Sequence, residues 1–323
     1  MFNRRQSYRS AYKGKKFNFW SFLLKILICV IVGVLIFFAV TSVMSYLANQ
    51  PGHNDPPVLE NGLFIFDSDL SKNGDRKPDV SIYLVAGKDQ NKELDAVFLV
   101  YVDSLLKEVN VLSIPRMFYF LYDNIDNMRL LEIYKNGGIG GLKKVISNSF
   151  GIPIDGTVII DMNAVKKLVD VVSGVKIDVP FNFNYKDDLQ NFEINLPKGE
   201  RVLNADESEQ YIRFVSGYQN LETGRNEAYL NFIDKYLATS YSMKNLIIIP
   251  VILPAIAGDI ETDMGIDQMA TAVKSILDLN NLNFKTFNLQ GEYSTLLSKS
   301  YFVIDKESAK ETVYENFNPY FSN

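Results

Sequence analysis

Residues 80–114 read VSIYLVAGKDQNKELDAVFLVYVDSLLKEVNVLSI, and this stretch decides the fold. It holds three short apolar runs rich in β-branched side chains, at residues 80–86, 96–102 and 109–114. Runs of this length and composition are typical of central strands that are covered on both faces of a sheet. The polar segments between them predict tight connections, so we expect three strands at the centre of a sheet.

Helical and extended patterns alternate through the rest of the chain. Further strands are predicted at residues 157–162, 175–179 and 285–289. Helices are predicted at residues 140–150, 164–172, 206–214, 226–241 and 267–279. Asn163 is expected to cap the second of these helices. Because strands and helices interleave, the sequence predicts an α/β (α+β layered) domain, a central mixed β-sheet flanked by helices, over residues 80–320.

The N-terminal region has the pattern of a membrane anchor. Residues 1–25 contain seven basic side chains and no acid, and residues 26–48 contain no charge. At about 1.5 Å per residue, a helix over that uncharged run crosses a bilayer core of roughly 30 Å. The alternative is a cleaved signal peptide, whose apolar core is shorter, at about 7–15 residues.

Basic flanks stay in the cytoplasm, so the orientation of this anchor is also predicted. We expect a cytoplasmic tail at residues 1–25, one transmembrane helix at 26–48, a linker and N-terminal extension at 49–79, and an extracytoplasmic domain at 80–320. The protein is then a single-pass protein of the cell membrane, with its N-terminus in the cytoplasm.

Charge and rare residues exclude several kinds of function. Without the seven basic residues of the tail, 26 of the 33 remain against 38 acids, which leaves the exported part near −12. Nucleic acid is therefore not an expected partner, since it requires basic patches. His53 is the only histidine, which rules out a multi-His metal site and a Ser-His-Asp triad with its base inside the predicted domain. Cys29 is the only cysteine, which rules out an intrachain disulfide.

A few charged residues lie where the predicted strands and helices end. Asp89 ends the first strand, Asp95 begins the second, and Arg116 follows the third in Ser-Ile-Pro-Arg. Two carboxylates suit a hard cation and arginine suits phosphate oxygens. Solvated turn residues and a surface ion pair are the plainer readings. Arg213 and Arg225, near helix ends, are candidates for the same anion site.

From about residue 80 to 238 the chain resembles the LytR–CpsA–Psr domain, also called the cell-envelope-related transcriptional attenuator domain. The matching pieces occur in the family's order: Gly87-Lys88-Asp89, Asp95, Leu112-Ser113-Ile114-Pro115-Arg116, Gly137-Gly138, Gly151-Ile152-Pro153-Ile154-Asp155, residues 169–175, residues 203–208, Tyr211-Ile212-Arg213 and Gly224-Arg225. A short basic tail, one membrane helix and an exported domain are also typical of the family.

The resemblance implies a phosphotransferase that moves a glycopolymer from a polyprenyl-pyrophosphate carrier to a cell-wall or envelope acceptor. Asp89 and Asp95 match the acids that hold Mg²⁺, and Arg116, Arg213 and Arg225 match catalytic arginines on the pyrophosphate. Arg129 and Glu222 fall at further substrate-binding positions. The resemblance also implies a pocket for the polyprenyl tail, with plain core as the alternative; its candidate residues are Phe118, Phe120, Leu131, Leu142 and Ile146.

Several positions depart from the family pattern. Glu93 stands where the family has an arginine, Met117 where it has an aspartate, and Val215 and Ala228 where it has two more arginines. Each charge-assisted contact to an anion contributes about 1.5–3 kcal/mol. The alternative function is therefore a catalytically impaired domain that binds polyprenyl lipid or an envelope partner as a scaffold.

Overall fold

The computed structural model describes residues 74–89, 91–120, 128–187, 192–218, 221–242, 256–265, 268–269, 272, 283–296 and 299–321. All of them belong to one compact unit, Asn54–Asn323. The predicted tail and membrane helix, and residues 49–73 of the linker, lie outside the described residues, as does most of the helix predicted at 267–279. Within the described ranges no helix is long and apolar enough to cross a membrane.

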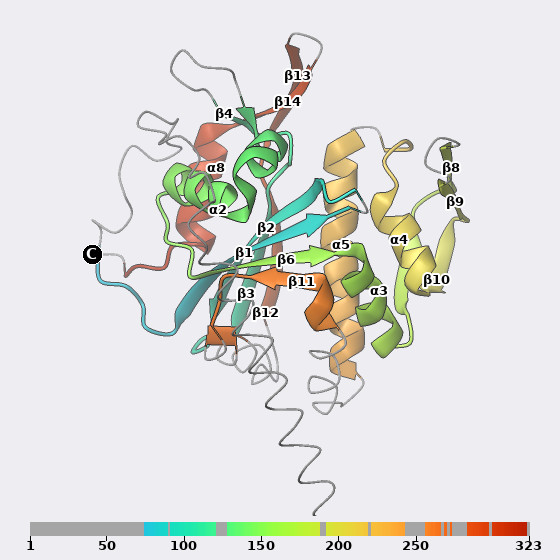
Figure 1. Cartoon of the computed structure of the whole chain (residues 1–323). Helices are drawn as coiled ribbons and strands as arrows, with labels where there is room; N and C mark the ends of the chain where they lie inside the picture. Colours follow the sequence, from blue (N-terminus) through green and yellow to red (C-terminus); the bar gives the residue numbers. More distant parts are fainter. Residues whose placement is uncertain are drawn as a thin grey trace, which may run out of the picture. The chain divides into compact units, whose positions relative to one another are not determined.

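A six-stranded mixed sheet forms the centre of this unit, in the order β11-β6-β1-β2-β3-β12 (Figure 1). Its strands are β1 Val80–Lys88, β2 Leu94–Asp103, β3 Glu108–Ser113, β6 Gly156–Asp161, β11 Ile260–Thr262 and β12 Asn283–Asn288. The β1-β2-β3 meander is antiparallel, while β6 pairs with β1 and β12 pairs with β3 in parallel. The prediction of a central mixed sheet flanked by helices is confirmed.

Helices cover both faces of the sheet (Figure 1). One core lies beneath α2 Leu130–Phe150 and α8 Lys306–Asn316. The other lies beneath α3 Met162–Val171, α4 Ala205–Arg213 and α5 Leu221–Ser242. Alternate residues of β2 enter different cores, Leu99 the first and Phe98 the second, because successive side chains of a strand point to opposite faces.

Small two-stranded ribbons extend this framework. Their strands are β4 Tyr119–Phe120 with β5 Met128–Arg129, β7 Val175–Val179 with β10 Gly199–Leu203, β8 Phe183–Asp187 with β9 Phe192–Leu196, and β13 Gly291–Leu296 with β14 Lys299–Ile304. A 3₁₀ turn, η2 Ala257–Asp259, precedes β11. Of these strands the sequence patterns predicted only β7.

Two predictions about helices were wrong in detail. The helix expected to begin at residue 140 begins at Leu130, and it bends at Gly138, whose φ of 57° and ψ of −153° are not helical. The cap of α3 is Asp161 rather than Asn163, since the Asp161 carboxylate accepts from the Ala164 N–H. Asp161 has the extended backbone that a capping residue requires, whereas Asn163 is already inside the helix.

Candidate functional site

A β-bulge at the start of β2 places Asp95. Gly87 pairs with Ala96 and Lys88 pairs with Leu94, so Asp95 is the extra residue without a partner on β1. A bulge changes the direction of the side chain that it carries. By simple alternation Asp95 would share a face with Val97 and Leu99; instead it bonds residues of α5, on the other side of the sheet.

Three side chains converge on the Asp95 carboxylate. Arg225 Nη1 and Arg116 Nη1 donate to Oδ1 over 2.8 and 3.2 Å, and the Tyr229 hydroxyl donates to Oδ2 over 2.6 Å. Arg225 Nη2 also donates to the Asp95 carbonyl over 3.3 Å. Arg225 and Tyr229 lie one turn apart on α5, and the guanidinium of Arg225 lies 5.6 Å from the Tyr229 ring centroid. The structure thus brings Arg116, Arg225 and Asp95 together.

Burial strengthens the electrostatic interactions among the charged groups of this cluster. The side chain of Arg225 is 4% exposed and that of Asp95 is 13% exposed. Burial by itself raises the pKa of the Asp95 carboxyl, but Arg225, the Tyr229 hydrogen bond and Arg116 outweigh it and hold that pKa below its ordinary value. Burial, together with the Asp95 charge, raises the pKa of Tyr229 well above its ordinary value. Asp95 is therefore ionised and Tyr229 is a neutral donor.

Asp89 organises the loop between β1 and β2. Its Oδ1 accepts from the backbone N–H groups of Asn91 and Glu93 over 2.9 and 2.8 Å. This bonding is the turn role that aspartate often has, and it holds the loop that leads to Asp95. Among the described residues there is no group of three or more His, Cys, Asp or Glu side chains that could hold a metal ion. Both oxygens of the Asp95 carboxylate already accept hydrogen bonds from arginine and tyrosine donors, so the Mg²⁺ assigned to Asp89 and Asp95 stays a prediction. Such an ion usually keeps several waters and takes further ligands from substrate phosphates.

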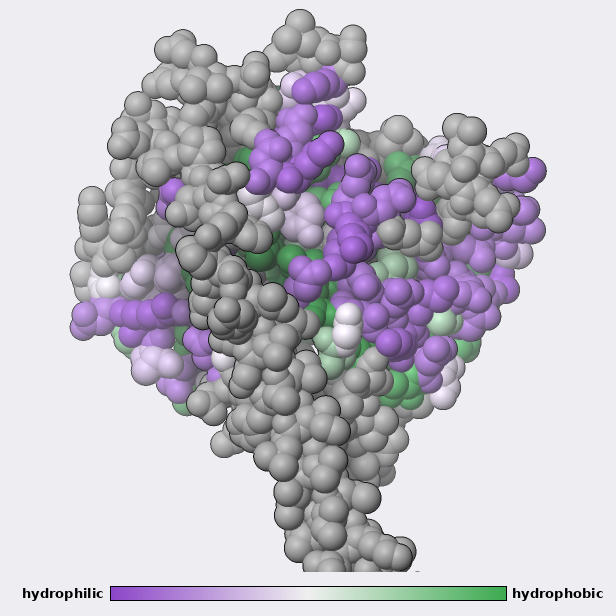
Figure 2. Space-filling view, viewed as in Figure 1, coloured by the Kyte–Doolittle hydropathy of each residue, from purple (hydrophilic) through white to green (hydrophobic). Residues whose placement is uncertain are grey.

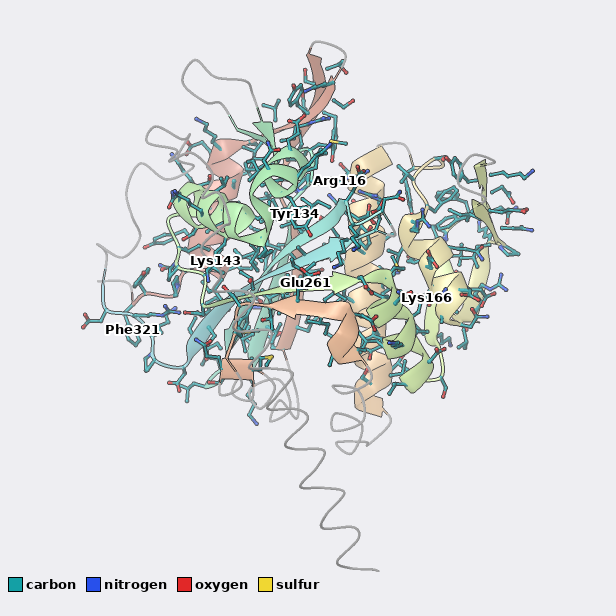
Figure 3. The ribbon with its side chains drawn as sticks, viewed as in Figure 1. Arg116, Tyr134, Lys143, Lys166, Glu261 and Phe321 are labelled. Atoms are coloured by element: carbon teal, nitrogen blue, oxygen red, sulfur yellow. The ribbon has the colours of Figure 1, made fainter. Side chains whose placement is uncertain are left out.

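Arg213 has a different partner from the other two arginines. It donates to Glu209 over 3.1 Å, one turn earlier on α4, and Glu209 also accepts from Lys166 of α3 over 3.3 Å. Glu209 is 6% exposed. In Figure 3, Lys166 is labelled beside α3 and α4, away from Arg116. The contacts that place Arg213 join α3 to α4.

Arg129 ends β5 as the N-cap of α2 and belongs to another polar cluster. It donates to Glu132 over 2.9 Å, Lys299 of β14 donates to the same carboxylate over 3.1 Å, and the guanidinium lies 5.6 Å from the Tyr301 ring centroid. Although burial opposes it, the bonds from Arg129 and Lys299 bring the pKa of Glu132 down to about 2. This cluster adjoins the site because the Leu131 N–H donates to the Arg116 carbonyl over 3.1 Å.

The residues predicted to line a lipid pocket belong mostly to the core beneath α2. Phe118, Leu142 and Ile146 are 1%, 0% and 0% exposed there, and Leu131 packs against the same core half-buried. The side chains of Phe120 and Glu222 lie outside the described residues. Figure 2 shows hydrophobic residues in the middle of the visible face, between hydrophilic groups on either side.

The four positions that depart from the family pattern differ from one another in their surroundings. Glu93 is exposed in the β1–β2 loop, and Val215 is half-buried after α4. Met117 accepts from Arg129 Nη1 at its sulfur, over 3.6 Å. Ala228 is 4% exposed in the core beneath α5, next to Tyr229.

Tyr229 was not predicted from the sequence, although it makes the shortest bond to Asp95. The available signal was its spacing: it lies four residues after Arg225, and residues at that spacing share one face of a helix. Glu209 and Glu132 were not predicted either, although their spacing was a similar signal. Glu209 pairs with Arg213, four residues later on the same helix, and Glu132 pairs with Arg129, three residues earlier at the N-cap of its helix.

Comparisons with known proteins agree on one family. The LytR_cpsA_psr family model matches residues 65–318. The chain is 28% identical over 187 residues to the polyisoprenyl-teichoic acid–peptidoglycan teichoic acid transferase TagV of Bacillus subtilis, a match covering 57% of this chain and only 48% of that protein. TagU of Oceanobacillus iheyensis, a transferase of the same description, is 21% identical over 307 residues, which cover 91% of this chain and 92% of that protein.

A solved structure shares the fold. The crystal structure of Bacillus subtilis TagV superposes with a TM-score of 0.62 at 24% identity, over 74% of this chain and 97% of that one. The central sheet and its covering helices are therefore those of a known architecture.

Proposed function

This chain belongs to the LytR_cpsA_psr family, and we propose from that membership that it transfers an anionic glycopolymer from a polyprenyl-pyrophosphate carrier to a cell-wall or envelope acceptor. Two of its relatives, TagV and TagU, are named as transferases of teichoic acid to peptidoglycan. In the proposed reaction an acceptor hydroxyl oxygen forms a bond to the glycan-side phosphorus. The bond from that phosphorus to the bridging oxygen breaks, polyprenyl phosphate leaves, and the hydroxyl proton passes to solvent.

The observation that carries this proposal is the convergence of Arg116 and Arg225 on one carboxylate at an end of the sheet. Phosphoryl transfer depends mainly on positioning and on neutralising oxygen charge. Asp95 holds two guanidiniums from distant segments in one place. The conformational entropy of these side chains is therefore lost during folding, before the substrate binds. These guanidiniums neutralise the phosphoryl oxygens, and Tyr229 fixes the carboxylate that orients them. Arg213 and Arg129 are proposed as outer contacts to the substrate.

We propose Mg²⁺ as the cofactor, held by Asp89 and Asp95. When bound it would neutralise charge on the substrate's phosphate oxygens. Asp89 already fixes the loop through two backbone bonds, so this carboxylate is held in place before an ion arrives. The core beneath α2, which contains Phe118 and Leu142, is proposed to open for the polyprenyl tail.

The proposed location is the outer face of the cell membrane, with residues 26–48 as the anchor. This placement rests on the uncharged run and the basic tail before it. It puts the domain where lipid-linked glycans and wall acceptors meet.

Transfer can be tested with purified full chain in detergent, polyprenyl-pyrophosphate glycan, a wall-derived acceptor and Mg²⁺. The expected result is release of polyprenyl phosphate together with labelled glycan on the acceptor. Arg116→Ala should lower that rate at least tenfold, because one charge-assisted contact to the phosphoryl group is lost. Lys310→Ala, a change of an exposed pair on α8, is the matched control. A rate unchanged in Arg116→Ala would contradict the proposal.

A second candidate function is a lipid-binding scaffold without turnover. Ala228 favours it, since a position where the resemblance expects an arginine is here part of an apolar core. The same preparation separates the two functions: a scaffold retains polyprenyl lipid but releases no polyprenyl phosphate.

A further inference from the structure

The backbone at Arg116 is held by two elements that lie outside the central sheet. The Arg116 carbonyl accepts from the Leu131 N–H, at the start of α2, over 3.1 Å. The next carbonyl, that of Met117, accepts from the Phe302 N–H of β14 over 2.8 Å. A parallel bridge between Phe118 and Phe302 continues this contact, and Figure 1 shows β14 beside β4. The segment that carries Arg116 is therefore held by α2 and β14 together.

The carboxylate of Glu132 joins these two elements to each other. Its Oε1 accepts from Arg129 Nη2 over 2.9 Å and from Lys299 Nζ over 3.1 Å, and its Oε2 accepts from the Arg129 N–H over 2.9 Å. The Arg129 guanidinium also donates to the Ser300 carbonyl over 3.3 Å. One carboxylate and one guanidinium thus connect the first turn of α2 to the first two residues of β14.

The contact of Arg116 with the site tolerates little displacement. Its Nη1 donates to Asp95 Oδ1 over 3.2 Å, at the upper end of the ordinary range for such bonds. A backbone shift of about 0.5 Å away from Asp95 takes this bond outside that range. Misplacing a catalytic group by about 1 Å can lower a rate about 100-fold. Contacts that fix the backbone of Arg116 therefore affect its chemistry without touching the substrate.

Partial burial makes the Glu132 contacts stronger than those of a surface pair. The side chains of Arg129 and Glu132 are 14% and 21% exposed, whereas that of Lys299 is 53% exposed. An ion pair gains strength as water is excluded from it, and an exposed pair contributes little. The Met117 sulfur, which also accepts from Arg129, is a weak acceptor. Loss of the Glu132 carboxylate should therefore loosen this junction more than loss of the Lys299 ammonium.

We propose that Glu132 is a positioning residue for Arg116. By joining the start of α2 to β14, it fixes the two N–H groups that hold the Arg116 and Met117 carbonyls, and through them the guanidinium at the anion site. This inference rests on the proposed function, in which Arg116 neutralises phosphoryl oxygens. The effect of Glu132 on transfer should thus depend on the Arg116 side chain. A general loss of stability would lower the rate whether or not that side chain is present.

The start of α4 supplies a matched control. Glu207 is the third helical residue of α4, as Glu132 is of α2, and it likewise accepts from the N–H of the residue that caps its helix. It also pairs with Arg201 of the preceding strand, β10, over 3.1 Å, and its side chain is 25% exposed. Glu207→Gln therefore removes an equivalent carboxylate without changing a contact of Arg116.

The first test measures amide hydrogen exchange of the full chain in detergent, without substrate. Glu132→Gln should speed exchange of the Leu131 and Phe302 N–H groups about tenfold, because the junction that protects them opens more often. Glu207→Gln should leave the exchange of both groups as it is in the unaltered chain. Unchanged exchange of both groups in Glu132→Gln would overturn the inference, whatever the effect on activity.

The second test measures the rate of glycan transfer at a temperature at which thermal unfolding shows each variant to be folded. Glu132→Gln should lower the rate about tenfold and Lys299→Met about threefold, while Lys299→Arg, which keeps the cation, should restore it. In an Arg116→Ala background, Glu132→Gln should lower the remaining rate by less than about twofold. An equal loss in both backgrounds would show that Glu132 acts independently of Arg116, and the inference would be wrong.

The outcomes separate this inference from the proposed function. If transfer falls in Arg116→Ala but not in Glu132→Gln, the positioning role is overturned and the proposed function stands. If the unaltered chain transfers no glycan, the proposed function fails. Faster exchange at Leu131 and Phe302 in Glu132→Gln would then still show that this carboxylate fixes the backbone of Arg116.

Discussion

Removing the Asp95 carboxylate should destabilise the fold itself, apart from any effect on a bound metal. Asp95→Asn removes a carboxylate that accepts from the guanidinium of Arg225, whose side chain is 4% exposed. It also changes the group that accepts from Tyr229 over 2.6 Å. Breaking a buried ion pair by removing one partner costs about 3–5 kcal/mol. For a domain of this size that corresponds to a fall in melting temperature of roughly 6–20 °C.

The assay is urea and thermal unfolding of the full chain in detergent, with EDTA present so that no divalent ion contributes. Asp170→Asn, a change of an exposed aspartate on α3, is the control and should leave stability within about 0.5 kcal/mol. Combining Asp95→Asn with Arg225→Met should cost less than the sum of the single changes, because the second change removes the buried charge that Asp95 neutralises.

The result that refutes this reasoning is an Asp95→Asn protein with the stability of the unaltered chain in EDTA. The cluster would then be held by its neighbours and not by the carboxylate. An additive double variant would likewise show that Asp95 and Arg225 do not depend on each other. If the prediction holds, activity lost in Asp95 variants cannot be assigned to a metal until their folding has been measured.

Three further predictions concern stability. Tyr229→Phe should cost about 1.5–3 kcal/mol in urea unfolding, since it removes a buried hydrogen bond to a charged group. The pKa of Glu132 is about 2, below its ordinary value, so the stability that this carboxylate contributes is complete above about pH 4.5 and is lost as pH falls toward 2. Glu132→Gln should therefore narrow the difference in unfolding free energy between pH 5 and pH 2.5. An unchanged pH profile of stability would disprove that contribution. Gly174→Ala should lower stability by about 1–3 kcal/mol, because Gly174 has a φ of 104° and an added Cβ would lie 2.9 Å from the Leu203 carbonyl oxygen; Gly140→Ala, where a Cβ meets nothing within 4 Å and φ is not positive, is the control.

Much of the architecture could be predicted because its signals are local. The three apolar runs in residues 80–114 identify β1, β2 and β3 through composition alone; the structure extends the first two by two or three residues and shifts the third by one. The start of α2 was harder, since Gly137 and Gly138 interrupt the helical pattern. Packing of Leu130 and Ile133 against the core compensates for the interruption.

The residues of the candidate site were predicted from residue type and resemblance, whereas the contacts that they make with one another were not predicted. Arg116 and Asp95 are 21 positions apart and Arg225 is 130 positions from Asp95, and no sequence spacing indicates that these three meet. Arg213 was grouped with them by residue type and by its place in the family motif, and in the structure it donates to Glu209 on its own helix. A charged residue takes the partner that the fold places beside it.

By itself the sequence determined what depends on neighbours along the chain: the apolar strands, the helical stretches, the charge balance and the uncharged run at residues 26–48. Only the tertiary structure decided which charges neutralise one another. The bulge at Asp95 directs that carboxylate toward α5, and burial then makes its contacts with Arg116, Arg225 and Tyr229 strong. Burial and long-range contact exist only after the chain has folded, so residue types and spacing alone cannot specify them.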